Sequence, residues 1–112
     1  MKSSDDVDVI LNELAKILYK KHEDYGPMNI AGAPGGPMNG LRVRMYDKLA
    51  RLSHLADNDT PNYESIEDTL IDLANYAIIG LLVQRGQWEG IPNGKQNEAG
   101  SRPQRPTKTL ST

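Results

Sequence analysis

Apolar residues recur at helical spacing in three stretches of the chain, and each stretch predicts a helix. The longest, residues 60–86, repeats apolar side chains every three or four positions and becomes apolar on nearly every side after Asn75. Thr60 and Pro61 predict its start, because threonine is a common N-cap and proline suits the first helical position. Gly86 predicts its end. The expected core face of this helix comprises Ile66, Leu70, Leu73, Ala74, Ala77 and Leu81.

The two earlier stretches show the same spacing. A capping pattern formed by Ser3 and Asp6 predicts the start of the first helix, which should end near residues 20–22, where positive charge suits the helix dipole. The second helix should begin at residue 39 or 40 and end near Ala56. The expected core positions are Val7, Ile10, Leu11, Leu14, Ile17 and Leu18 in the first helix, and Leu41, Met45, Leu49, Leu52 and Ala56 in the second.

The segments between the helices differ in character. Residues 26–40 contain three prolines and five glycines, which predicts a long loop without regular structure. A loop of this length is either functional, for example a lid over a small ligand, or disordered. Residues 57–60 form a short polar turn, so the second and third helices should be an antiparallel hairpin. The sequence thus predicts an all-α fold with a three-helix core, completed by self-association because the apolar end of the third helix needs covering.

Length and charge favour one domain followed by a tail. Of the 112 residues, 25% are charged and 38% hydrophobic, as in a globular domain. Residues 93–112 carry four basic residues and one acidic residue, which leaves a net charge of −5 on residues 1–92. We therefore expect a domain at 1–92 and a disordered basic tail at 93–112. Nucleic acid is not an expected partner of so acidic a body.

Several classes of protein are disfavoured by composition. The chain has no cysteine, which excludes disulfides, thiolate metal sites and a cysteine nucleophile. No apolar run reaches the roughly 20 residues of a membrane span, and the acidic N-terminus does not resemble a signal peptide. No membrane association and a cytoplasmic location are the resulting expectations.

Two rows of charge are predicted to face each other across the hairpin. Acidic residues recur every four positions on the third helix, at Glu64, Asp68 and Asp72, and a basic row on the second helix contains Arg44, Lys48 and Arg51. The acidic row has three interpretations: a Mg²⁺ site that bridges substrate phosphates, a salt-bridge ladder to the basic row without metal, or a solvated face.

Other residues extend the basic row into a candidate ligand site. Guanidinium groups match phosphate geometry, so the basic row is the best candidate for an anion site. Tyr25 either stacks on a base or packs beside a C-cap glycine, Gly26. A buried Asn75 needs partners, from a neighbouring helix or from a ligand. His22 and His54 are isolated and expected at the surface. The residues predicted to bind a nucleotide or other phosphorylated small molecule are Tyr25, Asn29, Arg42, Arg44, Lys48, Arg51 and Asn75.

Over about residues 10–90 the chain resembles a known family. Four segments occur in an order similar to that of small phage proteins of the nucleotide-modification-associated domain type. They are KHEDYG, a glycine-rich loop with an Asn, GLRVRMYDKLARL and ESIEDTLIDLANYAIIG. More distantly, the K-L-x-R word and the acidic helix are similar to the MazG-like all-α nucleoside triphosphate pyrophosphatases, which hold Mg²⁺ with E-x-x-E and E-x-x-D pairs. This chain has one such pair, Glu64-x-x-Glu67, but the acids that follow it have the different spacing Asp68-x-x-x-Asp72. The preceding helix has Lys48-x-x-Arg51 where carboxylates would be expected.

Three functions follow as hypotheses. The resemblance implies a phage protein of nucleotide metabolism, specifically a Mg²⁺-dependent (deoxy)nucleoside triphosphate pyrophosphohydrolase. In that enzyme Glu64, Asp68 and Asp72 would bind metal, and Lys48 and Arg51 would neutralise phosphate charge. The alternative is a nucleotide-binding protein without catalysis, such as a phage counter-defence protein that sequesters a nucleotide signal. The third is a small protein-interaction module that uses its apolar helix end. We expect a homo-oligomer, whereas a monomer with an exposed apolar patch and no nucleotide affinity would favour the third hypothesis.

Overall fold

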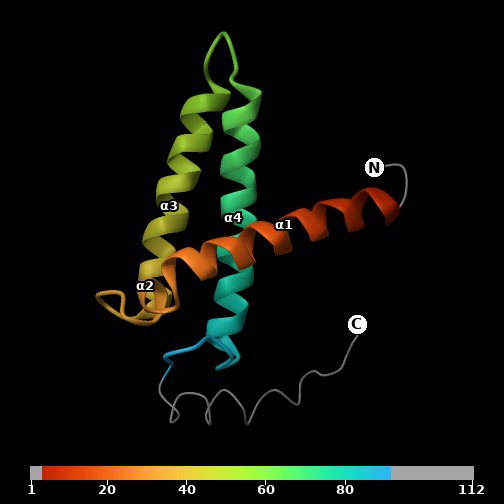
Figure 1. Cartoon of the computed structure of the whole chain (residues 1–112). Coiled ribbons are helices and arrows are strands. Elements are labelled where there is room, and N and C mark those ends of the chain that lie inside the picture. The colour runs from red at the N-terminus through yellow and green to blue at the C-terminus, as the bar shows by residue number, and fades with distance from the viewer. Residues whose placement is uncertain (1–3, 92–112) are drawn as a thin grey trace.

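The computed structural model describes residues 4–91, and this part of the chain is all-α (Figure 1). Its helices are α1 (Ser4–Tyr25), α2 (Met28–Ala31), α3 (Pro37–Ala56) and α4 (Tyr63–Gln84). α3 and α4 form the antiparallel hairpin, and α1 crosses it so that the first half of α1 extends away from the body (Figure 1). The predicted fold class and hairpin are confirmed. Ser3 and the predicted tail at 93–112 lie outside the described residues.

Two helix ends differ from those predicted. α4 begins after Asn62, not at Thr60, because the Asn62 side-chain oxygen accepts a hydrogen bond from the Ser65 backbone N–H at 3.0 Å and caps the helix. α1 continues to Tyr25, beyond the predicted end at residues 20–22. Gly26 follows it with a φ of +73°, the left-handed conformation that commonly terminates a helix.

The segment 26–40 is more ordered than its composition predicts. Met28–Ala31 form one helical turn, and α3 begins at Pro37, so the prediction of no regular structure is wrong there. Pro37 lies at the start of α3, where its missing N–H costs nothing, and Gly36 before it has a φ of +98°. Pro27, Gly32, Gly36 and Pro37 therefore mark both ends of α2 and the start of α3.

The hydrophobic core lies at the end of the hairpin near α2. Its buried cluster comprises Ile30, Leu41, Ile79, Trp88 and Ile91. Trp88 and Ile91 fold back onto the helices after α4, and the Trp88 indole N–H donates to the Pro27 carbonyl at 3.0 Å. This hydrogen bond fixes the chain after α4 against the start of α2.

The inward face of α4 is not the predicted one. Leu70 and Leu81 of the predicted core face are 49% and 50% exposed, whereas Thr69, Asn75 and Ile79 on another side of the helix are buried. Because polar groups line the interior of the first half of α4, the most apolar stripe there is not the buried one.

The predicted core face of α1 is also largely exposed. Ile10 is 55% exposed, and Leu14 is the buried residue of this helix. The first half of α1 thus keeps an apolar stripe outside the core. None of the helices in residues 4–91 is long and apolar enough to cross a membrane.

Candidate functional site

A cavity of about 420 Å³ lies between the second half of α1, α2, the hairpin and Trp88. Its size falls in the range of about 300–1,000 Å³ that is typical of small-molecule sites. Charged residues in its wall are Lys21, Arg44, Lys48 and Asp72; other polar or aromatic residues are His22, Tyr25, Asn29, Asn75, Tyr76 and Trp88; apolar residues are Leu18, Ile30 and Ile79.

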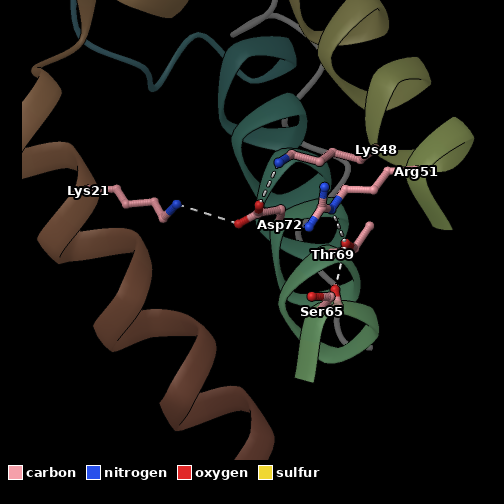
Figure 2. A network of polar contacts seen from close by, with 6 residues as sticks. All are labelled: Lys21, Lys48, Arg51, Ser65, Thr69 and Asp72. Atoms are coloured by element: carbon pink, nitrogen blue, oxygen red, sulfur yellow. Dashed lines mark hydrogen bonds and ion pairs between the residues drawn. The ribbon is translucent and has the colours of Figure 1, made fainter. Parts of the chain in front are cut away.

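Asp72 on α4 lies between two lysines that come from different helices. Lys48 Nζ on α3 is 2.9 Å from Asp72 Oδ2, and Lys21 Nζ on α1 is 3.5 Å from Oδ1, so each amine contacts a different oxygen of the carboxylate (Figure 2). With Arg44, the cavity wall carries three cationic side chains and one carboxylate. The wall is therefore electropositive although the domain as a whole is acidic.

Arg44 connects α3 to α2 at the cavity wall. Its guanidinium Nη2 donates to the Asn29 carbonyl at 3.2 Å. A guanidinium has five N–H donors in a planar fork, so this single contact leaves donors for an anion. Asn29 and Tyr25 line the same cavity, with Tyr25 67% exposed at its edge. The structure thus brings these two predicted residues next to the predicted cations.

Asn75 is buried in the cavity wall with its amide unpaired. It is 5% exposed, and neither Oδ1 nor Nδ2 has a hydrogen-bond partner among the described residues. Leaving a buried polar group without a partner costs about 1–3 kcal/mol. Of the two partners that the sequence suggested, no neighbouring helix in residues 4–91 supplies one, and a ligand as the partner stays a prediction.

His22 belongs to the cavity, contrary to the expectation of an isolated surface residue. Its Nε2 lies 2.9 Å from Glu89 Oε1, and its ring meets Trp88 edge-on with centroids 5.0 Å apart. His22 Nδ1 is buried without a partner in residues 4–91. The sequence did not predict this role of His22 because Glu89 and Trp88 are more than 60 positions away. Its place in the KHEDYG segment could have indicated it.

Four predicted site residues do not line this cavity: Arg42, Arg51, Glu64 and Asp68. Arg51 Nε donates to Thr69 Oγ1 at 3.3 Å, and Thr69 in turn donates to the Ser65 carbonyl at 2.7 Å (Figure 2). Arg42 lies on another face of α3, in the wall of a shallow, mainly apolar groove, with Nη1 3.5 Å from Asn39 Oδ1. Within the described chain, the two facing rows form one ion pair, Lys48 with Asp72.

The three predicted metal ligands do not come together. Only Asp72 lines the cavity, and residues 4–91 contain no group of three or more His, Asp or Glu side chains that could hold a metal ion. The oxygens of Asp72 also face two ammonium groups. This arrangement does not fit a resident Mg²⁺ held by Glu64, Asp68 and Asp72. Mg²⁺ bound together with a ligand stays a prediction of the sequence.

Most of the cavity residues fall within one family domain. Residues 21–83 match the model of the family described as nucleotide modification associated domain 1. The chain belongs to this family. The matched range includes all four charged residues of the cavity wall and Asn75, and the family description places the domain in nucleotide metabolism in the broad sense. Comparisons with curated proteins and with solved structures give no match.

Proposed function

We propose that this protein is a nucleotide-binding protein whose ligand occupies the cavity between α1, α2 and the hairpin. The observation that carries the proposal is the convergence of Lys21, Arg44 and Lys48 on a cavity whose wall contains one carboxylate, Asp72. Phosphate groups are the natural partners of such a set, because ammonium and guanidinium donors form strong charge-assisted hydrogen bonds to phosphate oxygens. The family description supports a ligand from nucleotide metabolism.

The cations are held in place before a ligand arrives. Asp72 keeps the two ammonium groups close together, and the Asn29 carbonyl orients the Arg44 guanidinium. A dianionic phosphate between the lysines would compete with a single carboxylate for them. Preorganised cations lose less side-chain entropy on binding, which favours affinity.

The geometry supports binding better than hydrolysis. Mg²⁺-dependent hydrolysis of a nucleoside triphosphate to a monophosphate and pyrophosphate needs carboxylates gathered around the metal and the phosphates. Glu64 and Asp68 stand outside the cavity wall, and Asp72 faces the two lysines. We therefore place binding without turnover, including the sequestration of a nucleotide signal, ahead of the pyrophosphohydrolase hypothesis.

A thermal-shift screen tests this proposal. The panel contains the deoxynucleoside mono-, di- and triphosphates, each with Mg²⁺ and each with a chelator in its place. At least one nucleotide should raise the melting temperature in the chelator, because a ligand that binds only the native state stabilises it. Chromatography of the recovered nucleotide should show it intact. Release of pyrophosphate and monophosphate would favour the enzyme, and absence of any shift under both conditions would overturn the proposal.

A further inference from the structure

We infer that Asn75 recognises the base of the bound nucleotide, so that the site selects nucleotides over phosphorylated compounds that lack a base. This inference rests on the proposed function and concerns the same cavity. It starts from an observation independent of the cations: the Asn75 amide is 95% buried, and both of its polar atoms are unpaired within the described chain.

The position of Asn75 suits a group that lies next to a phosphate. It follows Asp72 by three residues on α4, which puts it on the same side of the helix and about 4.5 Å further along the axis. Ile79 lies one turn beyond it in the same wall and belongs with Trp88, which also lines the cavity, to the buried core cluster. Along α4, Asn75 thus lies between Asp72, which contacts the two lysines, and the apolar end of the cavity.

The chemistry of an amide excludes phosphate as its sole partner. Asn75 offers one acceptor, Oδ1, beside one donor group, Nδ2. Ionised phosphate oxygens only accept, so they satisfy Nδ2 and leave Oδ1 unpaired. The edge of a nucleobase presents a donor beside an acceptor, and an asparagine amide pairs with such an edge in a bidentate manner, as it does with adenine in nucleic-acid recognition.

The apolar part of the cavity complements the faces of a base. Ile30, Ile79 and Trp88 belong to the buried core cluster and also line the cavity. A flat aromatic base gains favourable contact with such a wall, whereas a free sugar phosphate would leave it covered only by water. Both the amide and the apolar wall therefore favour a ligand with a base.

Two measurements test the inference. The first uses the unaltered protein and compares, by calorimetry, a nucleotide found in the screen with ribose 5-phosphate and inorganic triphosphate. The nucleotide should bind about 5-fold to 150-fold more tightly, as expected for one bidentate amide pair. Equal affinity for the base-free compounds would overturn the inference and leave the proposed function standing. If none of the compounds binds, the proposed function itself fails.

The second measurement uses Asn75→Leu, which keeps the approximate size of the side chain and removes both polar atoms. We expect a loss of about 10-fold to 100-fold in nucleotide affinity and unchanged affinity for inorganic triphosphate. Unchanged nucleotide affinity would overturn the inference. If Asn75→Leu does not fold, Asn75→Asp replaces it: it lacks the donor, so the ratio of nucleotide affinity to triphosphate affinity should fall, and an unchanged ratio would contradict the assignment.

Discussion

Lys48 and Asp72 form an ion pair across the α3–α4 hairpin, with Nζ 2.9 Å from Oδ2, and the same carboxylate is 3.5 Å from Lys21 on α1. Asp72 therefore links three helices at the wall of the cavity. Its side chain is 21% exposed and that of Lys48 is 30% exposed, so this pair is screened less than a surface pair. The contact explains how two like charges are held close together in a domain without a ligand.

Replacing Asp72 by Asn should lower the free energy of unfolding by about 1–2 kcal/mol, because it leaves Lys21 and Lys48 close together without a counter-charge. Urea denaturation measures the change. The control is Asp68→Asn, one turn earlier on α4 and outside the cavity wall. It should alter stability by less than about 0.5 kcal/mol. Equal effects of the two substitutions would contradict the role given to Asp72.

Trp88 provides an intrinsic signal for occupation of the cavity. It is the single tryptophan of the chain, and it lines the cavity beside His22. A nucleotide that binds there should change the intensity or wavelength of its emission as the ligand replaces water at the indole. Sodium chloride at the same ionic strength is the control for a salt effect. Saturable binding by calorimetry without any change in emission would place the ligand elsewhere.

Gly40 is required where α3 lies close to the connection that follows α2. A Cβ at this position would lie 2.5 Å from Ala33 Cβ. This clash should outweigh the roughly 1 kcal/mol that alanine gains in helix propensity, so we expect Gly40→Ala to lower the free energy of unfolding by about 1–3 kcal/mol. Gly80 is the matched control within α4, where a Cβ would have its nearest neighbour at 3.9 Å. Gly80→Ala should instead stabilise by about 0.5–1 kcal/mol. Thermal unfolding of both variants decides whether the two signs differ.

The exposed apolar stripe on α1 carries the prediction of self-association. Ile10 is 55% exposed and Leu11 is 52% exposed on the half of α1 that extends from the body (Figure 1). We expect sedimentation to give a mass above that of one chain, and Ile10→Lys to lower it. Asn12→Lys adds the same charge at an exposed polar position and should leave the mass unchanged. A monomeric unaltered protein would show that this prediction is wrong.

The sequence predicts the three long helices well because the helical spacing of apolar residues is strong and local. Gly86, the predicted end of the third helix, follows α4 with a φ of +70°, the left-handed conformation common at that position. The inward face of α4 was assigned incorrectly, since periodicity identifies an apolar stripe but not the neighbour that covers it. Thr69 is 1% exposed because it packs and bonds with Arg51 of α3, which only the packed hairpin reveals.

The candidate site was predicted in part for a related reason. Arg44, Lys48 and Asp72 meet because a short turn places α3 and α4 side by side, which the sequence indicates. Lys21 and His22 reach the cavity only because α1 crosses the hairpin (Figure 1), and no local pattern specifies that crossing. Helical spacing predicted that Glu64, Asp68 and Asp72 belong to one site. In the structure Asp72 lines the cavity, and Glu64 and Asp68 do not.

The most direct test of nucleotide binding compares Arg44→Gln with Arg42→Gln. Both remove one positive charge from α3, but Arg44 lines the cavity and Arg42 lies on another face. Calorimetric titration with the nucleotide selected by the screen, in the presence of a chelator, should give binding to the unaltered protein and to Arg42→Gln with similar affinity. Arg44→Gln should bind about 10-fold to 100-fold more weakly, as expected for a lost charge-assisted hydrogen bond. Equal weakening by both substitutions, or by neither, would contradict the account.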